Sequence, residues 1–95
     1  MPGADRHIRD RTCVEHILRY CEQVRGSLAE IQHDRDRFLA SHTYQNAISM
    51  CILQIGELTG GLSEEYRSST KEQIQWPHIK GVRNIIVHDY GKIQL

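Results

Sequence analysis

Two runs of apolar residues dominate this sequence, and both repeat in steps of three and four. Such steps place the apolar side chains on one face of an α-helix, because the helix turns once in about 3.6 residues. The sequence therefore predicts two long amphipathic helices, the first over residues 6–33. The first run is Val14, Ile17, Cys21, Val24, Leu28 and Ile31, and the second is Tyr44, Ile48, Cys51, Ile55, Leu58 and Leu62.

The connection between the two runs is short and mostly charged. It contains the only Phe, Phe38, which we expect in one short helical turn that reaches the core. Ser41 or Thr43 can cap the second helix. Gly60-Gly61 lies near its end, where glycine tolerates the left-handed conformation that closes a helix. Two long helices joined by so short a segment predict an antiparallel hairpin.

Two further elements are expected after residue 62. Ser63 and the two acids behind it are typical of the cap and first turn of a short helix, with a polar loop following over 67–71. Pro77 favours the first turn of a third long helix, which should end near Tyr90-Gly91. The expected fold class is all-α, a small antiparallel helical bundle. The inward face of the third helix would carry Ile79, Val82 and Ile86.

The chain length of 95 residues suits a single domain, 1–95. A chain this short buries only roughly 60% of the surface that its unfolded form exposes, so self-association is expected. Its apolar runs are shorter than the roughly 18–20 residues of a membrane span, and its first residues lack the plan of a signal peptide. We therefore expect a cytoplasmic protein with no membrane partner.

The charge and the metal-binding residue types narrow the function further. Three Cys and six His are present without the spacing of a zinc site, so neither a metal nor another cofactor is predicted. The 12 basic and 12 acidic residues cancel, which argues against a protein that coats nucleic acid. The balance is uneven, however. Residues 66–92 hold the basic residues Arg67, Lys71, Lys80, Arg83 and Lys92 against the acidic Glu72 and Asp89.

Four polar residues of the third helix could act on a phosphodiester. Arg83 offers a planar fork of donors to phosphate oxygens, and His88 can move a proton near neutral pH. Asn84 could orient either of them, and Tyr90 carries a hydroxyl that could be modified. At about 100° per residue, Arg83 and Tyr90 lie about 20° apart, but Arg83 and His88 diverge by about 140°. Either the helix distorts or ends before His88, or a second chain completes the site.

The string Arg83-x4-His88-x-Tyr90, with Asn84 behind the Arg, resembles the signature of the HEPN superfamily in its HepT-like toxin branch. The resemblance extends over roughly residues 14–92. Three more segments carry it: Ile55-Gly56-Glu57, Leu62-Ser63-Glu64-Glu65 and Trp76-Pro77-His78-Ile79-Lys80-Gly81.

The resemblance implies the toxin of a toxin-antitoxin pair, a metal-independent endoribonuclease that cleaves RNA. The chain would form a homodimer or a higher homo-oligomer, in which the motifs of two chains line one cleft. In this arrangement Arg83 would bind the scissile phosphate, His88 would act as general acid or base, and Asn84 would support the pair. A nucleotidyltransferase antitoxin would attach AMP to Tyr90 and so block the cleft. The bundle would lack the last helix that usually follows the Tyr.

Two other interpretations stay open at this point. The first is a non-catalytic HEPN module that binds a nucleotide or a nucleotidyltransferase partner. The second is a plain dimerisation bundle in which Arg83 and His88 only complement the dipole of a helix end. An RNA cleavage assay and the mass of the protein in solution distinguish these two interpretations from the ribonuclease toxin.

Overall fold

The computed structural model describes the backbone of residues 2–93 and the side chains of residues 6–88. All the regular structure in this range is helical, so the predicted all-α class is confirmed. No helix within these residues is long and apolar enough to span a bilayer. The chain order is α1 (Pro2–Glu30), α2 (Arg35–Ala40), α3 (His42–Gly60), α4 (Glu64–Thr70) and α5 (Trp76–Ile93).

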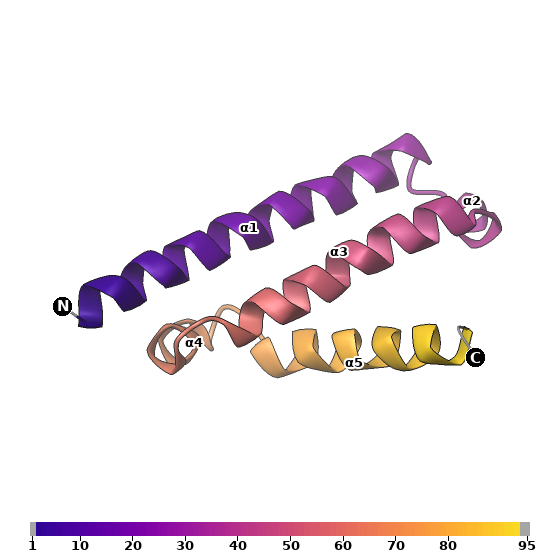
Figure 1. Cartoon of the computed structure of the whole chain (residues 1–95). Helices are drawn as coiled ribbons and strands as arrows, with labels where there is room; N and C mark the ends of the chain where they lie inside the picture. Colours follow the sequence, from indigo (N-terminus) through magenta and orange to yellow (C-terminus); the bar gives the residue numbers. More distant parts are fainter. Residues whose placement is uncertain (1, 94–95) are drawn as a thin grey trace.

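Helix α3 is the central element of the bundle (Figure 1). Helix α1 runs antiparallel along one side of it, which confirms the predicted hairpin, and α5 packs along another side. The molecule is elongated, with extents of 50 × 31 × 22 Å. Its small core comes from the two apolar runs and comprises Ile31, Ile48, Cys51 and Leu62.

Serine side chains cap the starts of α3 and α4. The Ser41 hydroxyl accepts a hydrogen bond from the Tyr44 amide at the start of α3. Ser41 is one of the two residues that the sequence offers as the cap of this helix. The Ser63 hydroxyl likewise accepts a hydrogen bond from the Tyr66 amide at the start of α4. These bonds satisfy amides that have no partner inside a helix.

Asp10 of α1 is joined to Ser63, so the first helix holds the start of the fourth. Its carboxylate accepts the Ser63 backbone N–H at 2.8 Å and the Ser63 hydroxyl at 2.7 Å. Asp10 is buried, and the two hydrogen bonds from Ser63 lower the pKa of its carboxyl group. The Ser63 hydroxyl that caps α4 is therefore held in place by Asp10 of α1.

The left-handed turn of the bundle lies elsewhere than predicted. Gly61 has φ −84° and no described glycine has a positive φ, so the expectation of a left-handed Gly60-Gly61 is wrong. Instead Gln32 and His33, after α1, have φ of 57° and 55°. The His33 amide donates to the Leu28 carbonyl at 2.8 Å, a bond that closes a helix through a left-handed residue.

Three other local predictions also need correction. Residues 67–70 are not part of a loop, because α4 continues to Thr70, and only Lys71 of the predicted loop lies outside the helix. Helix α5 does not end near Tyr90-Gly91 but continues to Ile93, since a glycine inside a helix costs only about 1 kcal/mol and need not end it. Val82 does not face inward and is 44% exposed, whereas Ile79 and Ile86 are half-buried.

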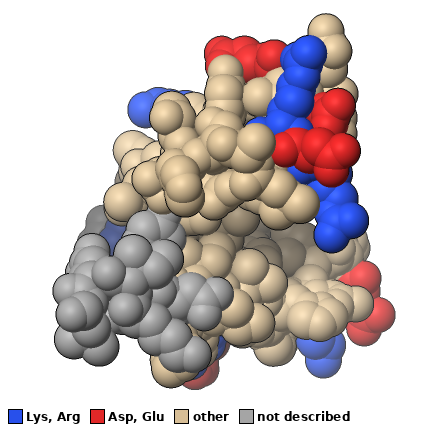
Figure 2. Space-filling view, turned by 90° about the vertical axis from the view of Figure 1, so that its right-hand side faces the viewer, with Lys and Arg blue, Asp and Glu red and all other residues tan. Residues whose placement is uncertain are grey.

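The short helix α2 supplies less to the core than the sequence suggests. Phe38 lies in it as predicted but is only half-buried, and no residue of α2 is buried. Figure 2 views the molecule from this end, and there basic and acidic side chains lie beside one another at the margin. Among the described residues, the α2 end therefore shows no surface dominated by one sign of charge.

Candidate functional site

The predicted site residue Arg83 lies on α5 where this helix crosses the C-terminal half of α3. The stem of its side chain lies against Gly56, so closely that a Cβ atom on residue 56 would come 2.6 Å from the Cβ of Arg83. Any larger residue at position 56 would force the two helices apart. Gly56 thus sets the position of Arg83 relative to α3.

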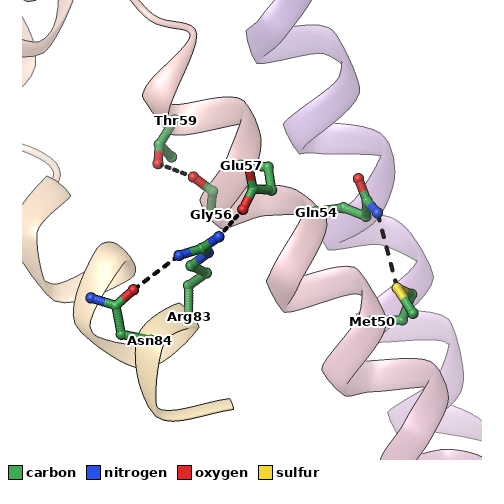
Figure 3. Close-up of polar contacts among 7 residues, drawn as sticks. All are labelled: Met50, Gln54, Gly56, Glu57, Thr59, Arg83 and Asn84. Atoms are coloured by element: carbon green, nitrogen blue, oxygen red, sulfur yellow. Dashed lines mark hydrogen bonds and ion pairs between the residues drawn. The ribbon is translucent and has the colours of Figure 1, made fainter. Parts of the chain in front are cut away.

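The guanidinium of Arg83 is held from two sides (Figure 3). Its Nη2 donates to the Glu57 carboxylate in an ion pair, and its Nη1 donates to the Asn84 side-chain oxygen at 3.1 Å. The Arg83 side chain remains 34% exposed. A fixed but accessible guanidinium is a suitable receptor for a phosphate, because its donors are oriented before the phosphate arrives.

Arg83 also borders a pocket of about 550 Å³ between three helices. The wall from α3 comprises Gly56, Glu57, Thr59 and Gly60. The opposite walls come from Arg67 of α4 and from Trp76, Pro77, Lys80 and Arg83 of α5. The volume falls within the range of about 300–1,000 Å³ typical of small-molecule sites.

The pocket is cationic and contains one fixed aromatic ring. Three basic side chains line it against a single acid, Glu57, which is already paired with Arg83. The Trp76 ring donates its Nε1–H to the Thr70 hydroxyl at 3.0 Å, and the Tyr66 ring lies 6.2 Å away at 56°. These two contacts hold the indole in place at the pocket wall.

Two other predicted site residues, Asn84 and His88, do not line this pocket. Asn84 and His88 are exposed on α5, and Asn84 is joined to Arg83 by the hydrogen bond given above. Because α5 continues to Ile93, the possibility that the helix ends before His88 is wrong. Tyr90 lies in the helical backbone, and its side chain is outside the described residues. Within one chain, therefore, Arg83 and His88 do not line one pocket.

Sequence reasoning did not assign a role to three residues that shape the site. Gly56 and Glu57 belong to a segment that carries the family resemblance, yet their functions depend on the crossing of α3 and α5. Arg67 was expected in a loop, but it lies in α4 and donates to the Thr59 carbonyl at 3.2 Å. The available sequence signal is the Gly56-Glu57 pair together with the distant Arg83. This signal alone does not show that these residues contact one another.

The described residues contain no group of three or more His, Cys, Asp or Glu side chains placed to hold a metal ion. The chain matches the sequence model of one protein family over residues 15–95. The family is named HepT-like and described as Ribonuclease HepT-like. The match takes in every residue that lines the pocket, as well as His88 and Tyr90. No solved structure matches the chain.

Proposed function

The chain belongs to the HepT-like ribonuclease family of the HEPN superfamily, and on that premise we propose that it is an endoribonuclease toxin of a toxin-antitoxin pair. The observation that carries the proposal is Arg83, which is held by Glu57 and Asn84 and remains exposed beside a cationic pocket. A guanidinium in this setting can bind a phosphodiester and stabilise the charge that develops on it during cleavage.

The proposed reaction uses the 2′-hydroxyl of the RNA as nucleophile. Its oxygen attacks the neighbouring phosphorus and loses its proton to a base, while the 5′-oxygen of the next nucleotide leaves and gains a proton from an acid. The products are a 2′,3′-cyclic phosphate and a 5′-hydroxyl. His88 takes one of the two proton transfers, and Arg83 binds the non-bridging phosphate oxygens. No metal ion enters this scheme.

The site is proposed to be complete only in a homodimer. On an ideal helix Arg83 and His88 diverge by about 140° around the axis, so one straight α5 cannot direct both to one phosphate. Two antiparallel copies would bring the motifs together in one cleft, where each phosphate can meet Arg83 of one chain and His88 of the other. The exposed apolar residues Val82 and Ile85 on α5 would support such an association.

Regulation is proposed to act through Tyr90. A nucleotidyltransferase antitoxin would transfer AMP to the Tyr90 oxygen, releasing pyrophosphate from ATP. Tyr90 follows Arg83 by seven positions, close to two full turns, so the two positions lie only about 20° apart around the axis of α5. The attached phosphate would compete with RNA for Arg83 and would repel the RNA backbone.

The test is cleavage of RNA in the presence of a chelator by the wild-type chain and by His88→Ala. The proposal predicts that only the wild type cleaves and that its products end in a cyclic phosphate. Equal activity of the two proteins, or none in either, would exclude it. Co-expression of the chain with a nucleotidyltransferase from a neighbouring gene should add the mass of AMP to the peptide that contains Tyr90.

The separation of Arg83 from His88 within one chain favours one alternative, a non-catalytic module that binds a nucleotide or a nucleotidyltransferase. This alternative predicts a monomer by light scattering and no ribonuclease activity. A dimer with activity lost in His88→Ala excludes it.

A further inference from the structure

We propose that the pocket beside Arg83 is a binding site for one nucleotide of single-stranded RNA, the neighbour of the phosphate that Arg83 binds. The base would lie against Trp76, and its phosphate would be bound by Lys80 and Arg67. This inference rests on the proposed ribonuclease function and adds the part of the substrate that the motif itself does not contact.

The pocket carries positive charge that no carboxylate of the described residues neutralises. Arg67 is half-buried, and its Nη1 donates only to the neutral Thr59 carbonyl. Among the described residues, neither Arg67 nor Lys80 forms an ion pair with a carboxylate. The pocket therefore presents two positive charges without a counter-ion, and an anion bound there would be stabilised by both.

Trp76 forms an aromatic wall of the pocket. The contacts of Trp76 with Thr70 and Tyr66 fix the indole before any ligand binds, so stacking costs little further side-chain entropy. A cationic groove that carries an ordered aromatic ring is the combination by which proteins bind single-stranded nucleic acid without reading its sequence. The combination favours a nucleotide over a simple inorganic anion.

The pocket is continuous with Arg83, which forms part of its wall. Lys80 precedes Arg83 by three residues, so the two lie on successive turns, about 4.5 Å apart along the helix axis. Both line the same pocket as Trp76. A strand whose phosphate is bound by Arg83 would thus place its next nucleotide over Lys80 and Trp76.

The chain offers a direct probe, because Trp76 is its only Trp. A short unstructured RNA is titrated into the full-length His88→Ala protein, which by the proposed function leaves the RNA intact. Quenching of the Trp emission reports contact with the indole, and fluorescence anisotropy of labelled RNA reports total binding. We expect both signals to saturate together.

Lys80→Gln tests the phosphate contact, with Arg35→Gln as its matched control. Each removes one exposed positive charge, but Arg35 lies in α2, at the opposite end of α3 from the pocket. In Lys80→Gln we expect RNA binding to weaken about three- to tenfold, and the slope of log K against log salt to fall by about 0.7, the loss of one phosphate contact on a single strand. Arg35→Gln should change neither.

The outcomes separate the two proposals. RNA binding without quenching, or equal weakening in Lys80→Gln and Arg35→Gln, would overturn the pocket assignment, and cleavage by the wild type would then leave the ribonuclease intact. Quenching that depends on Lys80 without cleavage by the wild type would support the pocket and overturn the ribonuclease. AMP that binds as tightly as the RNA would show a mononucleotide site and overturn the assignment to an RNA strand.

Discussion

Arg83 rests directly on Gly56, with no space between the two residues for a methyl group. The Cβ of Arg83 is fixed to the backbone of α5, so the contact cannot be relieved by rotating a side chain. The distance between α3 and α5 at the site is therefore set by a glycine. The same approach brings the guanidinium to Glu57, the next residue along α3.

Replacement of Gly56 by Ala should destabilise the fold. Removing a helical glycine gains about 1 kcal/mol, but overpacking costs about 1–3 kcal/mol, so we expect a net loss of about 1 kcal/mol. Gly26→Ala is the matched control, because Gly26 also lies inside a helix and a Cβ there would meet nothing within 4 Å. It should gain about 1 kcal/mol. Urea unfolding measures both, and a stabilised Gly56→Ala would contradict the close approach.

Glu57→Gln should strengthen RNA binding. The Glu57 carboxylate occupies the Arg83 guanidinium that the phosphate needs, so the two anions compete. A neutral amide keeps a hydrogen bond but removes this competition, and we expect binding about three- to tenfold tighter in a His88→Ala background. Anisotropy of labelled RNA checks this. Weaker binding would show instead that Glu57 positions Arg83 for the phosphate.

Asp10→Ala should destabilise the chain by about 1.5–3 kcal/mol, the range for hydrogen bonds to a charged group. The variant loses both bonds to Ser63 and leaves the start of α4 detached from α1. Glu72→Ala, an exposed change in the turn after α4, should alter stability by less than about 0.5 kcal/mol. Urea unfolding at neutral pH compares the two.

The contribution of Asp10 should also depend on pH. Its pKa is lowered in the folded chain by the bonds from Ser63. The unfolded chain therefore binds the proton first as the pH falls, and the stabilisation is complete above the ordinary value of 3.8 and decreases below it. The difference in unfolding free energy between wild type and Asp10→Ala should shrink only in that acidic range. A difference that shrinks already near neutral pH would contradict the assignment.

Gln32→Gly should stabilise the bundle by about 1 kcal/mol, since a non-glycine residue in the left-handed region costs about 1–2 kcal/mol and glycine returns part of this as entropy. Gln73→Gly, in the turn before α5, is the control, because Gln73 has no positive φ. Thermal unfolding should show a higher Tm for the first variant and a lower Tm for the second. Equal shifts would mean that the backbone at residue 32 is not strained.

The helices could be predicted from the sequence because each is specified by neighbouring residues. The apolar periods define α1 and α3, Ser41 and Ser63 mark two starts, and Pro77 fits the first turn of α5. Helix α4 was only half predicted because its second half is rich in hydroxyl residues, which are typical of loops. In the structure the hydroxyls of Ser69 and Thr70 donate to the Tyr66 carbonyl and so remain compatible with the helix.

The candidate site was less accessible to sequence reasoning, because its contacts join residues far apart in the chain. Arg83 could be selected from its chemistry, but its ion pair with Glu57 and its seat on Gly56 depend on how two helices cross. The position of the left-handed turn was predicted wrongly for a related reason. Glycine signals such turns, and here Gln32 adopts one because the bond from His33 to Leu28 closes α1.

Helix α5 packs chiefly against α3, whereas α3 is flanked by both other long helices. Helix α1 also packs chiefly against α3, but more extensively than α5 does. Helices with less packing open at a lower free energy than the rest of a fold, so α5 should exchange its amide hydrogens before the α1–α3 hairpin does. The Arg83 motif thus belongs to the less protected of the two long helices that pack against α3. A ligand that contacts both Arg83 on α5 and Arg67 on α4 would hold α5 against the rest of the fold. Binding of such a ligand would therefore slow amide hydrogen exchange along α5.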